Sequence, residues 1–197
     1  MKEEQPLEKT ISKFIDKLFS LKKHSILLIS VFILGFILRL VAAINLSVSA
    51  DMMHFVTHAI NFLSSGRLVT YDQSAGLWFA FTSTIYKIFG TTQFAAGFAS
   101  LLFGSFSILV VYLLSREFFN EKISLLAAFL VAISPFSIKS TVAEMDIMAM
   151  FFVLLGMLLF VKATKSSDNS KYLMSGIFIG LAIYTKVYPL LFIPSLL

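Results

Sequence analysis

The sequence predicts an all-α fold, a polytopic bundle of transmembrane helices, and its composition gives two reasons. Hydrophobic residues make up 58% of the 197 residues and charged residues only 14%, with a mean hydropathy of +0.89. Soluble domains are about half apolar and a quarter charged, so these few charges could not cover the surface of a globular protein. Disordered chains are poor in apolar residues, and disorder is therefore excluded as well.

The absence of Cys and the distribution of charge exclude several classes of function. The chain has no Cys, which excludes disulfides, thiolate metal sites and cysteine nucleophiles. Its net charge of +5 could suit a nucleic acid, but Lys and Arg stand mainly at the ends of apolar runs and form no basic stripe. This distribution is typical of a membrane protein, and no nucleic-acid partner is expected.

Residues 1–24 are predicted to form a cytosolic leader that precedes a membrane domain over 25–197. Lysines alternate in the leader with apolar residues at helical spacing, as in an amphipathic helix on a membrane surface. These apolar residues are Ile11, Phe14, Ile15, Leu18 and Phe19.

Five apolar runs of the membrane domain are predicted to span the bilayer, whose core takes about 20 helical residues. The predicted spans are 25–46, 94–115, 123–138, 147–161 and 172–185. The last three are shorter and need their polar flanks to reach the interfaces. A sixth run begins at residue 187 and is still apolar at 197, so we expect the N-terminal portion of a longer protein, whose activity in this form is open.

The distribution of Lys and Arg orients these spans, since cytoplasmic loops are enriched in both. With the N-terminus inside, the outer segments hold three of them: Arg67, Lys87 and Lys139. The inner segments hold eleven: Lys2, Lys9, Lys13, Lys17, Lys22, Lys23, Arg116, Lys122, Lys162, Lys165 and Lys171. The sequence therefore predicts a multi-pass cell-membrane protein with a cytosolic N-terminus.

The long outer loop, residues 47–93, carries two predicted helices. Ser49 can cap a helix over 51–64 that ends at Gly66, and a second helix over 76–89 ends at Gly90. The second is short for a span and contains Trp78, Tyr86 and Lys87, which suit a membrane interface. We expect both helices to lie along the outer membrane face.

The candidate functional residues are the four acids that this topology places outside, namely Asp51, Asp72, Glu144 and Asp146. Acids at membrane depth are costly, so together they could bind a divalent cation (Mn²⁺, Mg²⁺ or Zn²⁺) or supply a base. Glu144 and Asp146 lie about 200° apart on a straight helix and converge only if one of them is in the preceding loop. The alternative is that both simply favour the positive end of the helix.

Two histidines and two lysines extend this candidate site. Asp51, His54 and His58 are spaced i, i+3 and i+7, so one helix face presents all three to a metal. The alternative is that these histidines merely solvate a polar helix end. Lys186, at the outer end of the fifth predicted span, could pair with a lipid phosphate or simply snorkel to the interface, and Lys139 has the same two readings.

Several short segments resemble one family in their order and spacing. An acid, Asp51, opens the first outer loop. The other segments are Arg116-Glu117-Phe118-Phe119, Leu125-Leu126-Ala127-Ala128, Ser134-Pro135, Ala143-Glu144-Met145-Asp146, Gly180-Leu181-Ala182, Thr185-Lys186 and Pro189. Over residues 25–197 the chain resembles the membrane-embedded GT-C class glycosyltransferases, which include protein O-mannosyltransferases, aminoarabinose transferases and the catalytic subunit of oligosaccharyltransferase. The branch within this class stays open.

The resemblance implies transfer of a sugar from a polyprenyl-phosphate donor to a protein or lipid acceptor on the outer face of the membrane. Asp51 would then be the catalytic base, and Lys186 would lie near the donor phosphate. Glu144, Asp146 and His54 would form the metal or second acidic site, with His58, Asp72 and Lys139 as further candidates. Two alternatives remain, a transporter that binds cations or protons on the same acids and a non-catalytic membrane subunit.

Overall fold

The computed structural model describes residues 23–48, 50–67 and 76–191. The predicted leader helix, Ser49, Asp72 and the end of the sixth apolar run lie outside the described residues. The side chains of Lys23, Ala50 and Asp51 also lie outside them.

The described part of the chain is helical and contains no β-strand, which confirms the predicted all-α class. Its helices, in chain order, are α2 (Lys23–Asn45), α3 (Ala50–Ser65), α4 (Gly76–Phe89), α5 (Gln93–Arg116), α6 (Glu121–Ile133), α7 (Pro135–Lys139), α8 (Met145–Ser166) and α9 (Asn169–Thr185).

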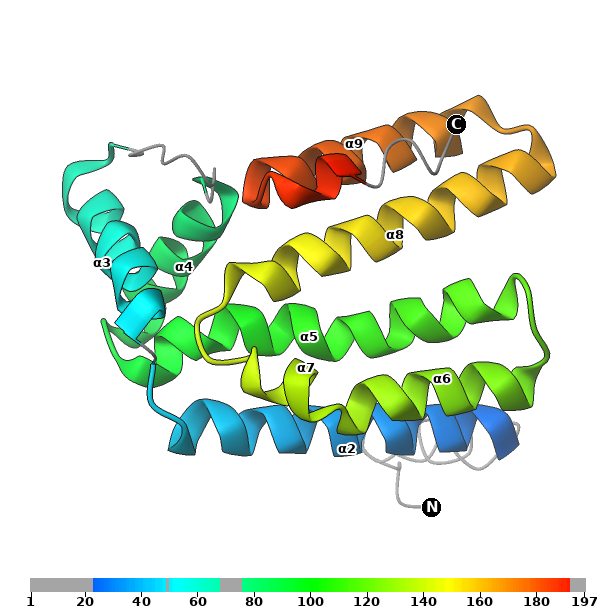
Figure 1. Ribbon diagram of the computed structural model, residues 1–197, viewed down its shortest axis with the longest axis horizontal. Coiled ribbons are helices and arrows are strands. Elements are labelled where there is room, and N and C mark those ends of the chain that lie inside the picture. Colours follow the sequence, from blue (N-terminus) through cyan, green and yellow to red (C-terminus); the bar gives the residue numbers. More distant parts are fainter. Residues whose placement is uncertain (1–22, 49, 68–75, 192–197) are drawn as a thin grey trace, which may run out of the picture.

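The five helices α2, α5, α6, α8 and α9 lie side by side as a bundle, and α3 and α4 pack together at one end of it (Figure 1). Among the described residues, three helices are long and apolar enough to cross a membrane: His24–Asn45, Gln93–Arg116 and Met145–Ser166. The pair α3 and α4 stands where α2 ends and α5 begins. The fold is therefore a membrane helix bundle with two short helices in the first long loop, as predicted.

Local sequence signals set the helix ends near this loop. Gly66 and Gly90 follow α3 and α4 with φ of 66° and 75°, the left-handed conformation that Gly adopts readily at a helix end. Thr92 caps α5, because its hydroxyl accepts a hydrogen bond from the Ala95 N–H at 3.2 Å. Both glycine positions agree with the sequence prediction.

The prediction of one continuous span over 123–138 is wrong, because the helix breaks at Ser134. Helix α6 ends at Ile133, and Pro135 begins α7. Proline lacks an N–H, so the carbonyl of Val131 loses its helical donor there. The break leaves α6 with 13 residues, which is about 20 Å of helix at 1.5 Å per residue.

Arg39 of α2 occupies this break. Its side chain is fully buried, and its guanidinium donates to the carbonyls of Val131 at 3.0 Å and Ala132 at 3.1 Å. It also donates to Ser137 Oγ at 2.7 Å. A cation at a helix C-terminus is favourable because the last carbonyls carry partial negative charge. Arg39 therefore caps α6 and ties α2 to both halves of the broken helix.

The apolar core nearest the loop forms where α3 and α4 pack on α5 and α8. Trp78 and Phe79 are 0% and 1% exposed, and Tyr86 is 3% exposed. Trp78 and Tyr86 are thus core residues, whereas the sequence suggested interface anchors. Composition alone cannot separate the two roles, since an aromatic residue with a polar atom is common in both settings.

Candidate functional site

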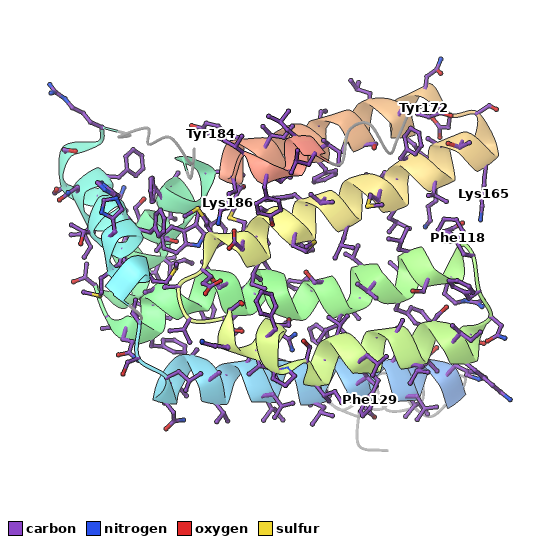
Figure 2. The ribbon with its side chains drawn as sticks, viewed as in Figure 1. Phe118, Phe129, Lys165, Tyr172, Tyr184 and Lys186 are labelled. Carbon is purple, nitrogen blue, oxygen red and sulfur yellow. The ribbon has the colours of Figure 1, made fainter. Side chains whose placement is uncertain are left out.

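The candidate site lies at the end of the bundle that carries α3 and α4. This end also holds the start of α8, which contains Asp146, and the end of α9, which is followed by Lys186 (Figures 1 and 2). Helices α3 and α4 contact each other, and α4 contacts both α5 and α9. Residues far apart in the sequence therefore meet at one end of the molecule.

Asp51 lies in the first turn of α3, because that helix begins at Ala50. Its side chain is outside the described residues, and so is all of Asp72. The backbone position alone puts Asp51 at the positive end of a helix dipole, where a carboxylate is favoured.

His54 and His58 lie on one face of α3, as their spacing predicts. Their rings meet edge to face with centroids 4.5 Å apart, and the His58 ring lies 5.7 Å from that of Phe79 on α4. Desolvation, helped by the neighbouring His54, lowers the pKa of His58. His58 is therefore neutral at physiological pH, the form in which imidazole binds metals.

The turn between α7 and α8 positions the two acids of α8. Ala143 has a φ of 60°, an uncommon conformation for a residue with a Cβ. Glu144 follows as the N-cap of α8 in extended conformation, and Ser100 of α5 donates its hydroxyl to the Glu144 carbonyl at 2.8 Å. This hydrogen bond fixes the turn to α5 and hence the start of α8.

Asp146 pairs with Lys186. The Lys186 ammonium lies 2.5 Å from a carboxylate oxygen of Asp146, and the two side chains are 24% and 37% exposed. The Lys186 ammonium also lies 5.7 Å above the ring of Tyr188, whose hydroxyl donates to the Asp146 carbonyl at 3.3 Å. Asp146 and Tyr188, from two distant segments, thus hold the partly exposed ammonium of Lys186 in place.

Glu144 faces a different neighbour from Asp146. It lines a cavity of about 420 Å³ together with Lys139, between the end of α2 and the turn that follows α7. Within the described residues, neither side chain forms an ion pair. The structure therefore brings Asp146 to Lys186 and Glu144 to the cavity of Lys139.

The described residues contain no group of three His, Asp or Glu side chains that could hold a metal ion. One oxygen of Asp146 is already engaged by Lys186. A metal site as predicted would therefore need the side chain of Asp51 or Asp72, both of which lie outside the described residues.

Tyr188 is a polar residue of this region that the sequence did not single out, and Tyr86 stood out in the sequence only as a residue suited to a membrane interface. Tyr188 stands two positions after Lys186, and this closeness to a candidate cation was the available signal. No sequence signal showed that Tyr86 is buried, because its burial depends on the packing of α4 against α3 and α5.

One comparison with known proteins gives a match. The family model for dolichyl-phosphate-mannose-protein mannosyltransferases matches residues 75–197, more than half of the chain. No curated protein and no solved structure matches the chain. The matched region covers helices α4 to α9 and includes Glu144, Asp146 and Lys186.

Proposed function

The chain belongs to the family of dolichyl-phosphate-mannose-protein mannosyltransferases, and from this premise we propose that it transfers mannose to a protein hydroxyl on the outer face of the membrane. Family membership makes the chain a GT-C class membrane glycosyltransferase with a dolichyl-phosphate sugar donor. It thereby favours sugar transfer over the transporter and the non-catalytic subunit. The sequence alone left the branch open, and we propose the mannosyltransferase branch because the matching family model describes mannosyltransferases.

In the proposed reaction Asp51 is the general base. Its carboxylate takes the proton of a Ser or Thr hydroxyl while the hydroxyl oxygen attacks C1 of the mannosyl group. The bond from C1 to the phosphate oxygen breaks, and dolichyl phosphate leaves with its electron pair. A positioned base of this kind contributes about 10²–10⁴-fold to a rate.

Lys186 is proposed to neutralise the leaving phosphate, and the observation that carries this role is its pairing with Asp146. A lysine is a flexible point charge, so the carboxylate of Asp146 and the ring of Tyr188 restrict where its ammonium lies. A positive charge that is held in place before the reaction, where the leaving phosphate develops negative charge, lowers the activation barrier of the transfer. Lys186 is 24% exposed and so stays accessible to a donor.

A divalent cation remains a further proposal rather than a step of this mechanism. Glu144 and His54 are the described side chains still proposed for it, and Asp51 would complete the set. Chelation by EDTA should then abolish transfer, and Mn²⁺ or Mg²⁺ should restore it. Full activity in EDTA would remove the cation from the mechanism.

The test of the base is Asp51→Asn in the protein purified in nanodiscs. With radiolabelled dolichyl-phosphate mannose and a Ser- or Thr-containing peptide, we expect kcat to fall about 100-fold or more. The matched control is Asp168→Asn in the turn before α9, where Asn can replace Asp as helix cap. Equal activity of the two variants would refute the role of Asp51.

A further inference from the structure

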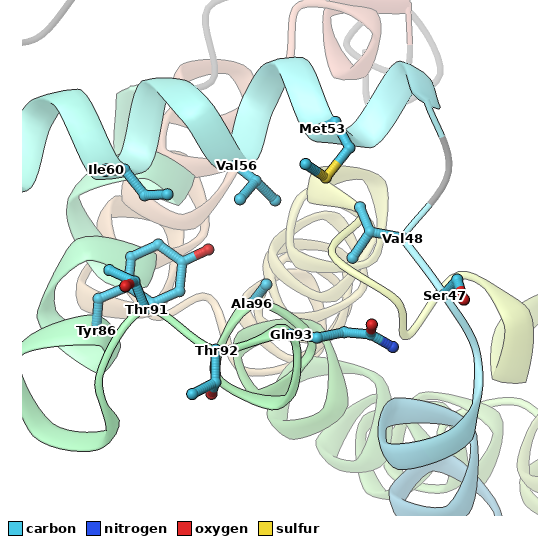
Figure 3. A pocket seen from close by; sticks show the side chains of 10 residues that line it. All are labelled: Ser47, Val48, Met53, Val56, Ile60, Tyr86, Thr91, Thr92, Gln93 and Ala96. Carbon is cyan, nitrogen blue, oxygen red and sulfur yellow. The ribbon is translucent and has the colours of Figure 1, made fainter.

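A second cavity lies under α3, on the side where α5 begins. It measures about 340 Å³ and is bounded by α3, the end of α4, the first residues of α5 and the segment after α2 (Figure 3). Such a volume is at the lower end of the range for small-ligand sites. Met53, Val56 and Ile60 of α3 form its apolar wall.

The opposite wall carries hydroxyl and amide groups at fixed positions. Thr92 is held by its cap on α5, and the Gln93 side-chain amide donates to the Leu46 carbonyl at 2.5 Å. Thr91 and Ser47 add two further hydroxyls to the lining. One wall of the cavity is therefore apolar and the other can form hydrogen bonds.

Tyr86 lines this cavity, and its hydroxyl lies buried in the cavity wall. The residue is 3% exposed, and Figure 3 shows the hydroxyl directed toward the space between Val56 and Ala96. Among the described residues its buried oxygen has no hydrogen-bond partner. Burial raises the pKa of Tyr86 to about 12, so the group remains a proton donor at neutral pH. A buried donor without an acceptor is unfavourable, and a ligand carbonyl would relieve this.

The lining restricts the chemistry of such a ligand. None of the described lining residues is Lys, Arg, His, Asp or Glu, so the cavity does not suit a phosphate or a sugar phosphate. A hydrocarbon chain would leave the buried hydroxyl of Tyr86 without a hydrogen-bond partner, which is costly. A polypeptide segment with apolar side chains fits best. Its side chains can contact the apolar wall, and its backbone offers carbonyls and N–H groups to the polar wall.

The cavity also lies next to the proposed base in the chain. Met53 stands two residues after Asp51, and Val48, another lining residue, stands three residues before it. We propose that this cavity binds the residues beside the acceptor hydroxyl of the protein substrate, with Tyr86 donating a hydrogen bond to a carbonyl of the bound segment. This inference rests on the proposed function, because it gives the protein acceptor of the proposed mannosyl transfer a binding site.

The first experiment is Tyr86→Phe, which removes the hydroxyl and keeps the ring. We expect the KM for an acceptor peptide to rise about 5- to 10-fold, as for loss of one neutral hydrogen bond, with the KM for the donor unchanged. Tyr172→Phe at the opposite end of the bundle is the matched control. An unchanged acceptor KM, or a raised donor KM, would overturn the proposal.

The second experiment detects binding without catalysis. A photoreactive phenylalanine analogue replaces Met53, which is 51% exposed at the edge of the cavity, in the Asp51→Asn background. Irradiation should crosslink a labelled acceptor peptide, and the same analogue at Leu113 of α5 should not. Crosslinking to lipid in place of peptide would overturn the acceptor assignment.

The two proposals can fail separately. If Asp51→Asn abolishes transfer while Tyr86→Phe changes nothing, the acceptor site is wrong and the proposed function stands. If Tyr86→Phe raises the acceptor KM while Asp51→Asn keeps full activity, the acceptor site stands and the role of Asp51 is wrong.

Discussion

At the scale of single residues, the pairing of Lys186 with Asp146 makes a specific kinetic prediction. Lys186→Met should lower kcat/KM for the dolichyl-phosphate donor by about 10- to 100-fold, as expected for loss of a hydrogen bond to a charged group. Lys186→Arg should restore part of the loss. Lys87→Met, an exposed lysine at the end of α4, serves as control. Similar losses in the Lys186→Met and Lys87→Met variants would show that general surface charge, and not this position, matters.

The residues that sequence could identify were those with unusual chemistry for their position. Asp146 and Lys186 stand out because charged side chains beside apolar runs need a reason. Their mutual contact could not be predicted, since it joins segments 40 positions apart. Nor could the direction of Glu144, because the left-handed Ala143 before it has no sequence signal: Gly, Asn and Asp favour that conformation, and Ala does not.

At the scale of helices, the cap that Arg39 provides for α6 predicts a large stability effect. Arg39→Met leaves the carbonyls of Val131 and Ala132 without these donors, and each buried unpaired group costs about 1–3 kcal/mol. We expect a clear decrease in Tm, measured by thermal unfolding in detergent. Gly104→Val should act in the same direction, since a Cβ there would lie 3.1 Å from Arg39 Nε.

A control for this prediction is Lys139→Met, which alters an exposed cation of α7. Its Tm should stay close to that of the unaltered protein. A Tm for Arg39→Met equal to that of the control would mean that water or lipid satisfies the end of α6 equally well.

The opposite end of the bundle makes a prediction about pH. Glu117, after α5, pairs with Lys165 of α8 at 2.9 Å and with Lys162 at 3.9 Å, and Lys165 lies over the ring of Phe118 (Figure 2). The hydrogen bond from Lys165 lowers the pKa of Glu117 below its ordinary value of 4.5.

The resulting stabilisation is present above pH 4.5 and is lost as the pH falls through the lower pKa of the folded protein. The Tm difference between the unaltered protein and Glu117→Gln should therefore be small and positive at pH 7, because the pair is exposed. It should shrink as the pH falls below 4.5. A difference that is constant across this range would contradict the assignment.

The helices themselves were largely predictable, and the errors have a physical cause. Apolar runs located α2, α5, α8 and α9 to within a few residues, because long uncharged segments are stable in a membrane only as helices. The run over 123–138 concealed the break before Pro135. A proline can begin a new helix or kink an existing one. Here the Val131 carbonyl, which Pro135 leaves without a helical donor, accepts a hydrogen bond from Arg39 of α2. This contact joins distant segments and has no local sequence signal.

At the scale of the whole molecule, the topology is open to direct test. The chain has no Cys, so each introduced thiol reports alone. Lys87→Cys at the end of α4 should react with a membrane-impermeant maleimide in intact cells, whereas Ser170→Cys in α9 should react only after permeabilisation. The reverse pattern would place α3 and α4 in the cytosol and exclude the proposed outer-face reaction.

The buried guanidinium of Arg39 also has a consequence for biosynthesis. Its partners on α6 and α7 follow 92 to 98 residues later in the chain, which ribosomes need roughly 5–20 s to add at about 5–20 residues per second. During this interval the nascent α2 carries an arginine within its apolar sequence. An arginine costs about 2.5–3.5 kcal/mol at the centre of a membrane helix, and Arg39, which lies nearer the end of α2, costs less. The exposed isoleucines and leucines of α2 offset that cost until Val131 and Ala132, whose carbonyls bind Arg39, have been synthesised. The apolar excess of α2 thus serves insertion as well as the finished fold.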